Sequence, residues 1–227
     1  MTELLLAAIL FLFLHALSST PLRAMVVGLT GEMAFKGIFS ALSIMAIVWM
    51  AHAYNTAPSG DILWAVGQWG RHVAAIVMAL AVFFVVAGMT LANPTAAGFE
   101  GALESTEPAR GILRVTRHPV MWGFVLWGLA HLLNNGDLKS VIFFGAFTVL
   151  ALVGTRLIDT KRMRAFGQIW QNYVEKTSNL PFLAIVQGRN RFVWREVGVW
   201  RLVAAILIFA ALLLGHEALF GVSPAPI

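Results

Sequence analysis

Six long apolar stretches constrain the fold of this chain more than any other feature of its sequence. They cover residues 3–20, 33–54, 72–92, 118–134, 140–158 and 200–220, and charged residues, prolines or glycine clusters bound each of them. A helix of about 20 mostly apolar residues crosses the hydrocarbon core of a bilayer. Because the chain is 59% hydrophobic and only 12% charged, its composition is that of an integral membrane protein. We therefore expect an all-α fold, a polytopic membrane helix bundle of about six transmembrane helices.

The distribution of basic residues predicts how this bundle is oriented. Of the 16 Lys and Arg residues, all but Arg71 and Lys139 lie within or at the edges of the loops after the first, third and fifth stretches. Cytoplasmic loops of membrane proteins carry an excess of Lys and Arg. Both termini are therefore expected to be non-cytoplasmic. The same asymmetry accounts for the net charge of +5, so the expected partner is the lipid bilayer and not nucleic acid.

Histidine is the residue type that most needs an explanation, because this apolar chain has 6 of them. Ionisable side chains inside a bilayer are costly and mark functional sites. His52, His72 and His216 fall near the external ends of their stretches, where an amphipathic ring suits the headgroup region. His15 lies well inside the first stretch, and His131 lies near the external end of the fourth.

The neighbours of His131 leave two interpretations open. In a helix it shares a face with Phe124, Trp127 and Gly128. That surface suits a flat apolar cofactor with the imidazole as its ligand. It equally suits close helix packing around a hydrogen-bonded core histidine.

His15 is open to the same two interpretations. It precedes Ser18 and Ser19, so a hydroxyl one turn away is expected to orient its ring, as an outer partner does for a metal-bound imidazole. Neutral imidazole is the commonest metal ligand, and two imidazoles from different helices can hold haem iron. The chain has no cysteine, which excludes thiolate ligands and thiol nucleophiles.

A polar site is expected at the cytoplasmic ends of the fourth and fifth stretches. The fourth opens with Arg117-His118-Pro119, and a proline suits the first turn of a helix because it has no amide proton and a fixed φ. At the end of the fifth stretch, Arg156 can pair with Asp159 at i+3 on the same helix. We expect Arg117, His118, Arg156 and Asp159 to form one site.

Several motifs spread over nearly the whole length resemble the NnrU family of membrane proteins, to which plant zeta-carotene isomerase is related. They are His15 followed by Leu22-Arg23, Asn93-Pro94-Thr95, the Arg117-His118-Pro119 to His131 helix followed by Gly136-Asp137, Arg156-Leu157-Ile158-Asp159, Thr177-Ser178-Asn179-Leu180-Pro181-Phe182, and Gly188-Arg189-Asn190-Arg191. The resemblance implies a single integral membrane domain over residues 1–227 in a bacterial inner membrane, linked to denitrification or to cis-trans isomerisation of a carotenoid-like lipid.

The resemblance also implies a cofactor and its ligands. The isomerase is a haem b enzyme, and its axial histidines match His15 and His131 here. Gly128 stands where the isomerase has an alternative cysteine ligand, so the chain departs from the pattern that underlies redox-dependent ligand switching. If the chain is an enzyme, the resemblance makes it a haem-dependent isomerase with an apolar, lipid-like substrate.

The depths of the two histidines set a condition on this pair. In upright helices His15 lies about twelve residues and His131 about three residues from the external helix ends, so their depths differ by roughly 13 Å. They can bind one iron only if tilt or a kink removes most of this offset. Otherwise His131 is expected to pair with His52 or His72, and His15 becomes a core histidine.

Two other functions stay open. The C-terminal half more distantly resembles the isoprenylcysteine carboxyl methyltransferases and the sterol reductases. That resemblance implies that Arg117, His118, Arg156 and Asp159 contact a nucleotide-type cofactor, S-adenosylmethionine or a nicotinamide nucleotide, in a pocket packed by residues 170 and 173. The remaining alternative is a non-enzymatic membrane assembly factor in which the histidines are structural.

Overall fold

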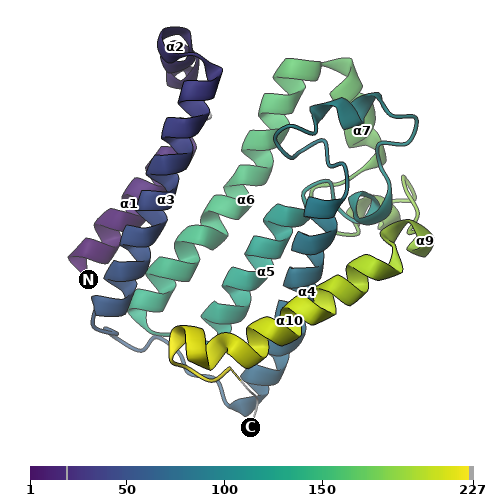
Figure 1. The fold of residues 1–227 in the computed structure, drawn as a ribbon. Helices are drawn as coiled ribbons and strands as arrows, with labels where there is room; N and C mark the ends of the chain where they lie inside the picture. The colour runs from purple at the N-terminus through teal and green to yellow at the C-terminus, as the bar shows by residue number, and fades with distance from the viewer. Residues whose placement is uncertain (19, 225–227) are drawn as a thin grey trace. The chain divides into compact units, whose positions relative to one another are not determined.

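The computed structural model describes residues 1–18 and 20–224, and every regular element among them is helical (Figure 1). The elements are α1 (Thr2–Leu17), α2 (Pro21–Thr30), α3 (Glu32–Thr56), α4 (Gln68–Thr90), the 3-10 helices η1 (Glu100–Glu104) and η2 (Gly111–Arg114), α5 (Pro119–Asn134), α6 (Leu138–Phe166), α7 (Gln168–Lys176), α8 (Leu183–Val186), α9 (Trp194–Val197) and α10 (Val199–Phe220). The expected all-α fold is confirmed, and each of the six apolar stretches forms a helix.

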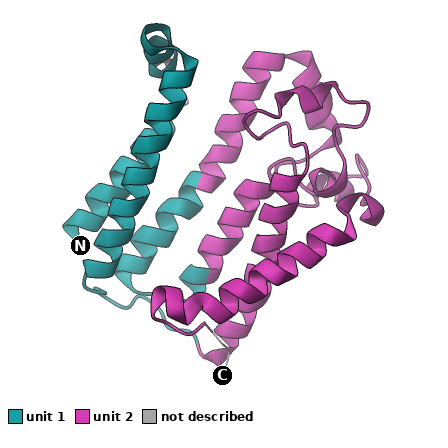
Figure 2. Ribbon diagram, viewed as in Figure 1, with its two compact units in different colours: residues 1–66, 131–150 teal, residues 67–130, 151–227 magenta. Residues whose placement is uncertain are grey.

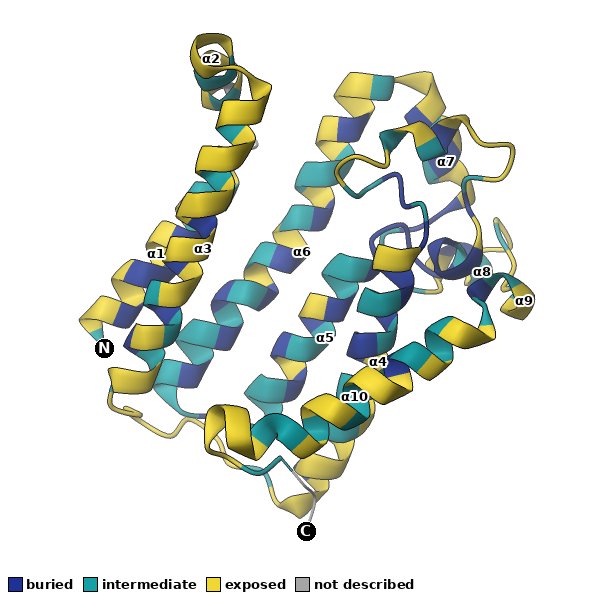
Figure 3. Cartoon of the chain, in the orientation of Figure 1, coloured by how far each residue is buried: buried dark blue, intermediate teal, exposed yellow. Residues whose placement is uncertain are grey.

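Four of the described helices, α3, α4, α6 and α10, are long and apolar enough to cross a membrane. The bent pair α1 and α2, with 76° between its halves, adds a fifth span if it is counted as one. The sixth expected crossing, α5, is a shorter apolar helix of 16 residues, or about 24 Å. Many positions along these helices are exposed (Figure 3). Large apolar residues are among them, such as Leu29 at 82% and Leu214 at 84%. The chain is thus a polytopic membrane protein, and the side on which its termini lie stays a prediction.

The helices gather into two compact units (Figure 2). Unit 1 comprises Met1–Val66 and His131–Leu150, and unit 2 comprises Gly67–Ala130 and Ala151–Ile227. The expectation of a single domain over the whole chain stays a prediction.

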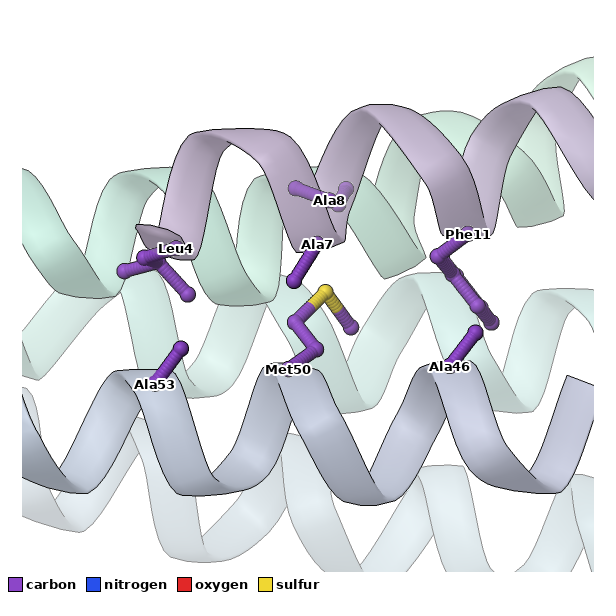
Figure 4. Close-up of a cluster of buried hydrophobic side chains, with 8 residues drawn as sticks. Leu4, Ala7, Ala8, Phe11, Ala46, Met50 and Ala53 are labelled. Carbon is purple, nitrogen blue, oxygen red and sulfur yellow. The ribbon is translucent and has the colours of Figure 1, made fainter. Parts of the chain in front are cut away.

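Unit 1 has its core between α1 and α3, which run antiparallel (Figure 4). The side chains that interlock there recur about once per helical turn, and three of them are alanines: Leu4, Ala7 and Phe11 on α1, and Ala46, Met50 and Ala53 on α3. Small residues let two apolar helices approach closely, which is how helices associate within lipid.

A glycine fixes the loop of unit 1 that follows α3. A Cβ on Gly136 would lie 2.0 Å from the carbonyl oxygen of Trp64, so only glycine fits there. The amide of Leu63 donates to the Gly136 carbonyl over 2.8 Å, and Ile62 forms an isolated bridge with Asp137. The loop is thereby held against the turn between α5 and α6.

Unit 2 is built on a close approach of α4 and α5. A Cβ on Gly123 would lie 2.5 Å from Cγ2 of Val85, and one on Gly88 would lie 2.8 Å from Cγ of Pro119. Pro119 is the first residue of α5, as predicted from its chemistry. After α6, the chain turns at Gly167, whose φ is +47°, into the amphipathic helix α7.

Candidate functional site

Unit 2 contains a buried polar cluster around the carboxylate of Asp159, near the end of α6. Arg117 donates from Nε to Oδ1 over 2.9 Å and from Nη2 to Oδ2, and His118 Nε2 lies 2.8 Å from Oδ1. Arg117 is 8% and His118 1% exposed, whereas the Asp159 side chain is 21% exposed. Because a carboxylate bound to a guanidinium only accepts, Nε2 of His118 carries the proton. The pair meets the condition for a tolerated buried charge, since it is hydrogen-bonded.

The segment 177–182 holds this cluster in place. The Arg117 amide donates to the Ser178 carbonyl over 3.0 Å, and Trp122 Nε1 donates to the Asn179 carbonyl over 2.8 Å. Asn179 in turn donates to Oγ1 of Thr155 on α6 over 2.8 Å. The Thr177 to Phe182 motif therefore acts as a backbone clamp that joins the start of α5 to α6.

The structure brings together three of the four residues predicted for this site. Arg117, His118 and Asp159 meet, but the predicted pair between Arg156 and Asp159 is wrong. The Asp159 carboxylate is bound by Arg117 and His118, and Arg156 is exposed. The guanidinium fork of Arg117 reaches both carboxylate oxygens from a different element, which a neighbour one turn away on α6 cannot match.

A cavity of about 400 Å³ lies beside the cluster. Its lining includes Arg117, Asp159, Arg164 and Trp170. Trp170 is fully buried and Tyr173 is 2% exposed, and both pack in a buried cluster with Leu103 and Ala109. That they pack a cofactor pocket stays a prediction.

Three buried polar atoms near this cavity lack hydrogen-bond partners within the described residues: Nδ1 of His118, Nε1 of Trp170 and the hydroxyl of Tyr173. Burial raises the pKa of Tyr173 well above its ordinary value, so this phenol is a neutral hydroxyl near pH 7. Next to its charges, the cluster therefore has two unused donors, on Trp170 and Tyr173, and one unused acceptor, Nδ1 of His118.

The ring of His15, in unit 1, is oriented by a backbone carbonyl and not by serine. Nδ1 donates to the Phe11 carbonyl over 2.8 Å, while Ser18 donates its hydroxyl to the His15 carbonyl over 2.7 Å. The expectation that the Ser18 hydroxyl orients the ring is therefore wrong, and Ser19 lies outside the described residues. Nε2 of His15 has no hydrogen-bond partner among residues 1–18 and 20–224. A ring with one nitrogen held by a carbonyl and the other open is typical of a metal-ligating histidine.

His131, also in unit 1, stacks on Phe144 with ring centroids 4.5 Å apart and 20° between the planes. A continuous series of aromatic contacts connects it to His15. In order, the pairs are Phe144–Phe143 at 5.1 Å, Phe143–Phe147 at 5.3 Å, Phe147–Phe11 at 4.8 Å and Phe11–His15 at 4.5 Å. We call these four phenylalanines the aromatic ladder.

The aromatic ladder gives the difference in depth between the two histidines. The first halves of α1 and α6 run in the same direction, because Met1 and Leu138 both lie beside Gly60. On α1, His15 lies four residues beyond Phe11, which contacts Phe147 of α6. On α6, Phe144, on which His131 stacks, lies three residues before Phe147. Seven residues of helical rise correspond to roughly 10 Å, less than the 13 Å expected for upright helices.

The other histidines fit the interpretation as headgroup-level residues. His52 on α3 and His72 on α4 are exposed, and Nδ1 of His216 lies 2.8 Å from the Val222 carbonyl. Within the described residues, no three His, Cys, Asp or Glu side chains gather as a metal site. A haem needs only two axial protein ligands, so the pair His15 and His131 suffices in number.

The sequence did not indicate a second ion-pair cluster, in which Arg114 binds Glu196. Arg114 Nε donates to Oε2 over 2.7 Å and Nη2 to Oε1 over 2.8 Å, and the Gly111 amide also donates to Oε2 over 2.8 Å. The hydrogen bonds from Arg114 lower the pKa of Glu196, against the opposing effect of burial. Their separation of 82 residues gives no local signal of the pairing.

Fold and sites together define a class: a helical membrane protein with two histidines on an aromatic ladder and a buried Arg-His-Asp cluster. The chain belongs to the NnrU family, whose model, described as "NnrU protein", matches residues 3–224. This confirms the resemblance inferred from the motifs.

Two curated relatives have names that state an activity. The chain is 29% identical over 191 residues to a 15-cis-zeta-carotene isomerase, chloroplastic, from Zea mays, covering 83% of this chain and 51% of the relative. It is 30% identical over 165 residues to the protein of that name from Arabidopsis thaliana, covering 71% and 44%. The chain thus spans about half the length of these relatives. No solved structure matches it.

Proposed function

We propose that this chain is a haem b-binding, isomerase-like membrane protein that acts on a cis double bond of a carotenoid-like lipid. The observation that carries the proposal is the similarity to two isomerases over 71% to 83% of the chain. A polyene substrate is apolar and lies in the bilayer, which fits a polytopic membrane protein. A bacterial inner-membrane location belongs to the same proposal.

The residues of unit 1 fit a haem ligand set. Nε2 of His15 is open and its ring is held by the Phe11 carbonyl. The aromatic ladder offers apolar faces of the kind that a porphyrin contacts. Haem would supply a redox-active iron, which could interact with a double bond of the polyene only after one of the two histidine ligands has left it. The protein's part is to hold the iron through His15 and His131 and to exclude water.

The proposal is tested by the conversion of 15-cis-zeta-carotene, followed by chromatography of its isomers. Wild-type protein from haem-supplied cells should form the isomer whose 15-double bond is trans. His15→Ala and His131→Ala should lose this activity, while the matched control His216→Ala, at an exposed helix end, should keep it. No conversion by wild-type protein reconstituted with haem and substrate would reject the isomerase proposal and favour an assembly role in denitrification.

A second candidate function is the binding of a nucleotide-type cofactor, and the cavity beside Asp159 is the observation that favours it. Its size suits part of such a molecule, and Trp170, whose Nε1 has no hydrogen-bond partner among the described residues, belongs to its lining. However, Arg117 and His118 are already bound to Asp159, so neither is available to a phosphate unless that cluster opens.

Calorimetry on the purified protein with S-adenosylmethionine and with a nicotinamide nucleotide separates these functions. Binding that is lost in Arg117→Gln but kept in Arg156→Gln would support a transferase or reductase. If neither ligand binds, the Asp159 cluster is a structural connection between α5 and α6.

A further inference from the structure

An apolar groove of about 440 Å³ lies between α4 and α10 in unit 2. Leu80 and Phe83 line it from α4, and Leu202 and Ile206 line it from α10. Trp194 of α9, which is 53% exposed, completes its lining. Both α4 and α10 are long and apolar enough to span the membrane, so the groove lies at the depth of lipid acyl chains.

The groove adjoins a positively charged end. Arg201, the residue before Leu202, bonds only to neutral oxygens: Nε to Oγ1 of Thr90 at 2.9 Å, Nη2 to the Thr90 carbonyl at 3.1 Å and Nη1 to the Val197 carbonyl at 2.9 Å. These bonds fix the guanidinium at the end of α4 without neutralising it. Helix C-terminal carbonyls stabilise such a cation in place.

Two further arginines lie around the same turn. Arg195 follows Trp194 directly and is exposed. Arg110 is exposed and precedes Gly111, whose amide bonds to Glu196. Neither guanidinium forms an ion pair with a described residue.

The acidic side chains at this turn do not neutralise the arginines. Glu196 is bound by Arg114, which also lies 3.5 Å from Glu107. The turn thus has four guanidiniums, those of residues 110, 114, 195 and 201, but only these two carboxylates. The turn keeps a positive charge, and by the distribution of basic residues it lies on the cytoplasmic side.

We propose that this groove and its cationic turn bind one anionic phospholipid, with an acyl chain between α4 and α10 and the phosphate at Arg110, Arg195 and Arg201. An apolar polyene would fill the groove but leave these charges unmet, so charge complementarity favours the anionic lipid. Trp194 is placed as an interfacial tryptophan between chain and headgroup. The site does not rest on the proposed isomerase activity.

The test measures lipid bound to delipidated, detergent-purified full-length protein by native mass spectrometry, with phosphatidylglycerol and phosphatidylcholine added separately. Wild type should bind phosphatidylglycerol preferentially. The double variant Arg110→Gln/Arg195→Gln should bind it about 30-fold more weakly. Ala79→Phe, which fills the groove, should lose binding while keeping the elution profile and melting temperature of wild type in phosphatidylcholine. Arg164→Gln, an exposed arginine at the other cavity, is the control and should bind as wild type.

Three results would overturn the proposal. Equal binding of the two phospholipids, or equal weakening in Arg164→Gln and in the double variant, would make the effect general surface charge. If inorganic phosphate protects the protein against thermal unfolding as well as phosphatidylglycerol does, the groove is not part of the binding site. Displacement of the groove's lipid by a C40 polyene, with no preference for anionic lipid, would assign the groove to an apolar substrate.

Discussion

Replacing Asp159 by asparagine removes the one negative charge that holds Arg117 and His118. The wild-type carboxylate accepts from Arg117 Nε and Nη2 and from His118 Nε2. Removing one partner of a buried, hydrogen-bonded charge pair costs about 3–5 kcal/mol. Asp159 is 21% exposed, so water reaches part of the site, and we take the lower end, about 3 kcal/mol. For a chain of this size that corresponds to a fall in melting temperature of about 6–12 °C.

The assay is thermal unfolding of Asp159→Asn in detergent, measured beside Arg156→Gln. Arg156 is exposed, so its replacement should change stability by less than about 0.5 kcal/mol. The reverse order, with Arg156→Gln the more damaging, would show that the structure assigns the wrong arginine to this carboxylate. A double variant Arg117→Met/Asp159→Leu should recover part of the loss, because both buried charges are then absent.

Three further variants test other parts of the structure. Gly136→Ala should destabilise by about 3 kcal/mol, since its Cβ would lie 2.0 Å from the Trp64 carbonyl oxygen, and a wild-type melting temperature would contradict that contact. Gly123→Ala should cost about 1–3 kcal/mol in the same assay, because its Cβ would lie 2.5 Å from Cγ2 of the stiff Val85 side chain and 3.0 Å from the Ala81 carbonyl oxygen. Because the pKa of Glu196 is lowered in the folded protein, its contribution is present above its ordinary pKa of 4.5 and is lost as pH falls below it. Glu196→Gln should therefore lie below wild type in melting temperature at pH 7, and this difference should shrink as the pH falls below 4.5.

Much of the fold follows from the sequence because hydrophobic length is a local property. The stretches 33–54 and 200–220 became α3 and α10 within two residues at each end. Pro119 fixed the start of α5. The apolar stretch 140–158 is only the membrane part of α6, and the helical spacing of the charged and aromatic residues beyond it predicts the continuation that the structure shows to Phe166.

The partners of individual polar side chains were less predictable, because they depend on which helices meet. An i+3 rule pairs Asp159 with Arg156, but contacts between α5 and α6 give it Arg117. The sequence analysis expected a serine hydroxyl to orient the His15 ring. The ring instead bonds to the Phe11 carbonyl one turn back, which costs no ordering of a second side chain. No local pattern predicted that Glu196 binds Arg114.

The relation between the histidines needs the structure most of all. The sequence placed His15 and His131 on separate helices and gave a depth difference of roughly 13 Å for upright helices, but it could not show which side chains lie between them. The aromatic ladder reduces the offset to roughly 10 Å. Binding of one iron by both rings would require a movement of α1 against the first half of α6 that removes most of this offset, nearly two helical turns.

The absorption spectrum of protein purified from haem-supplied cells tests the central claim most directly. The spectra to compare are those of wild type, His15→Ala, His131→Ala, His52→Ala and His72→Ala. A bis-histidine Soret band that is present in wild type and in the last two variants, and lost in the first two, is the predicted result. Loss in His52→Ala or His72→Ala with retention in His15→Ala would move the site to the external helix ends, and a wild-type protein that binds no haem would contradict the haem-binding account.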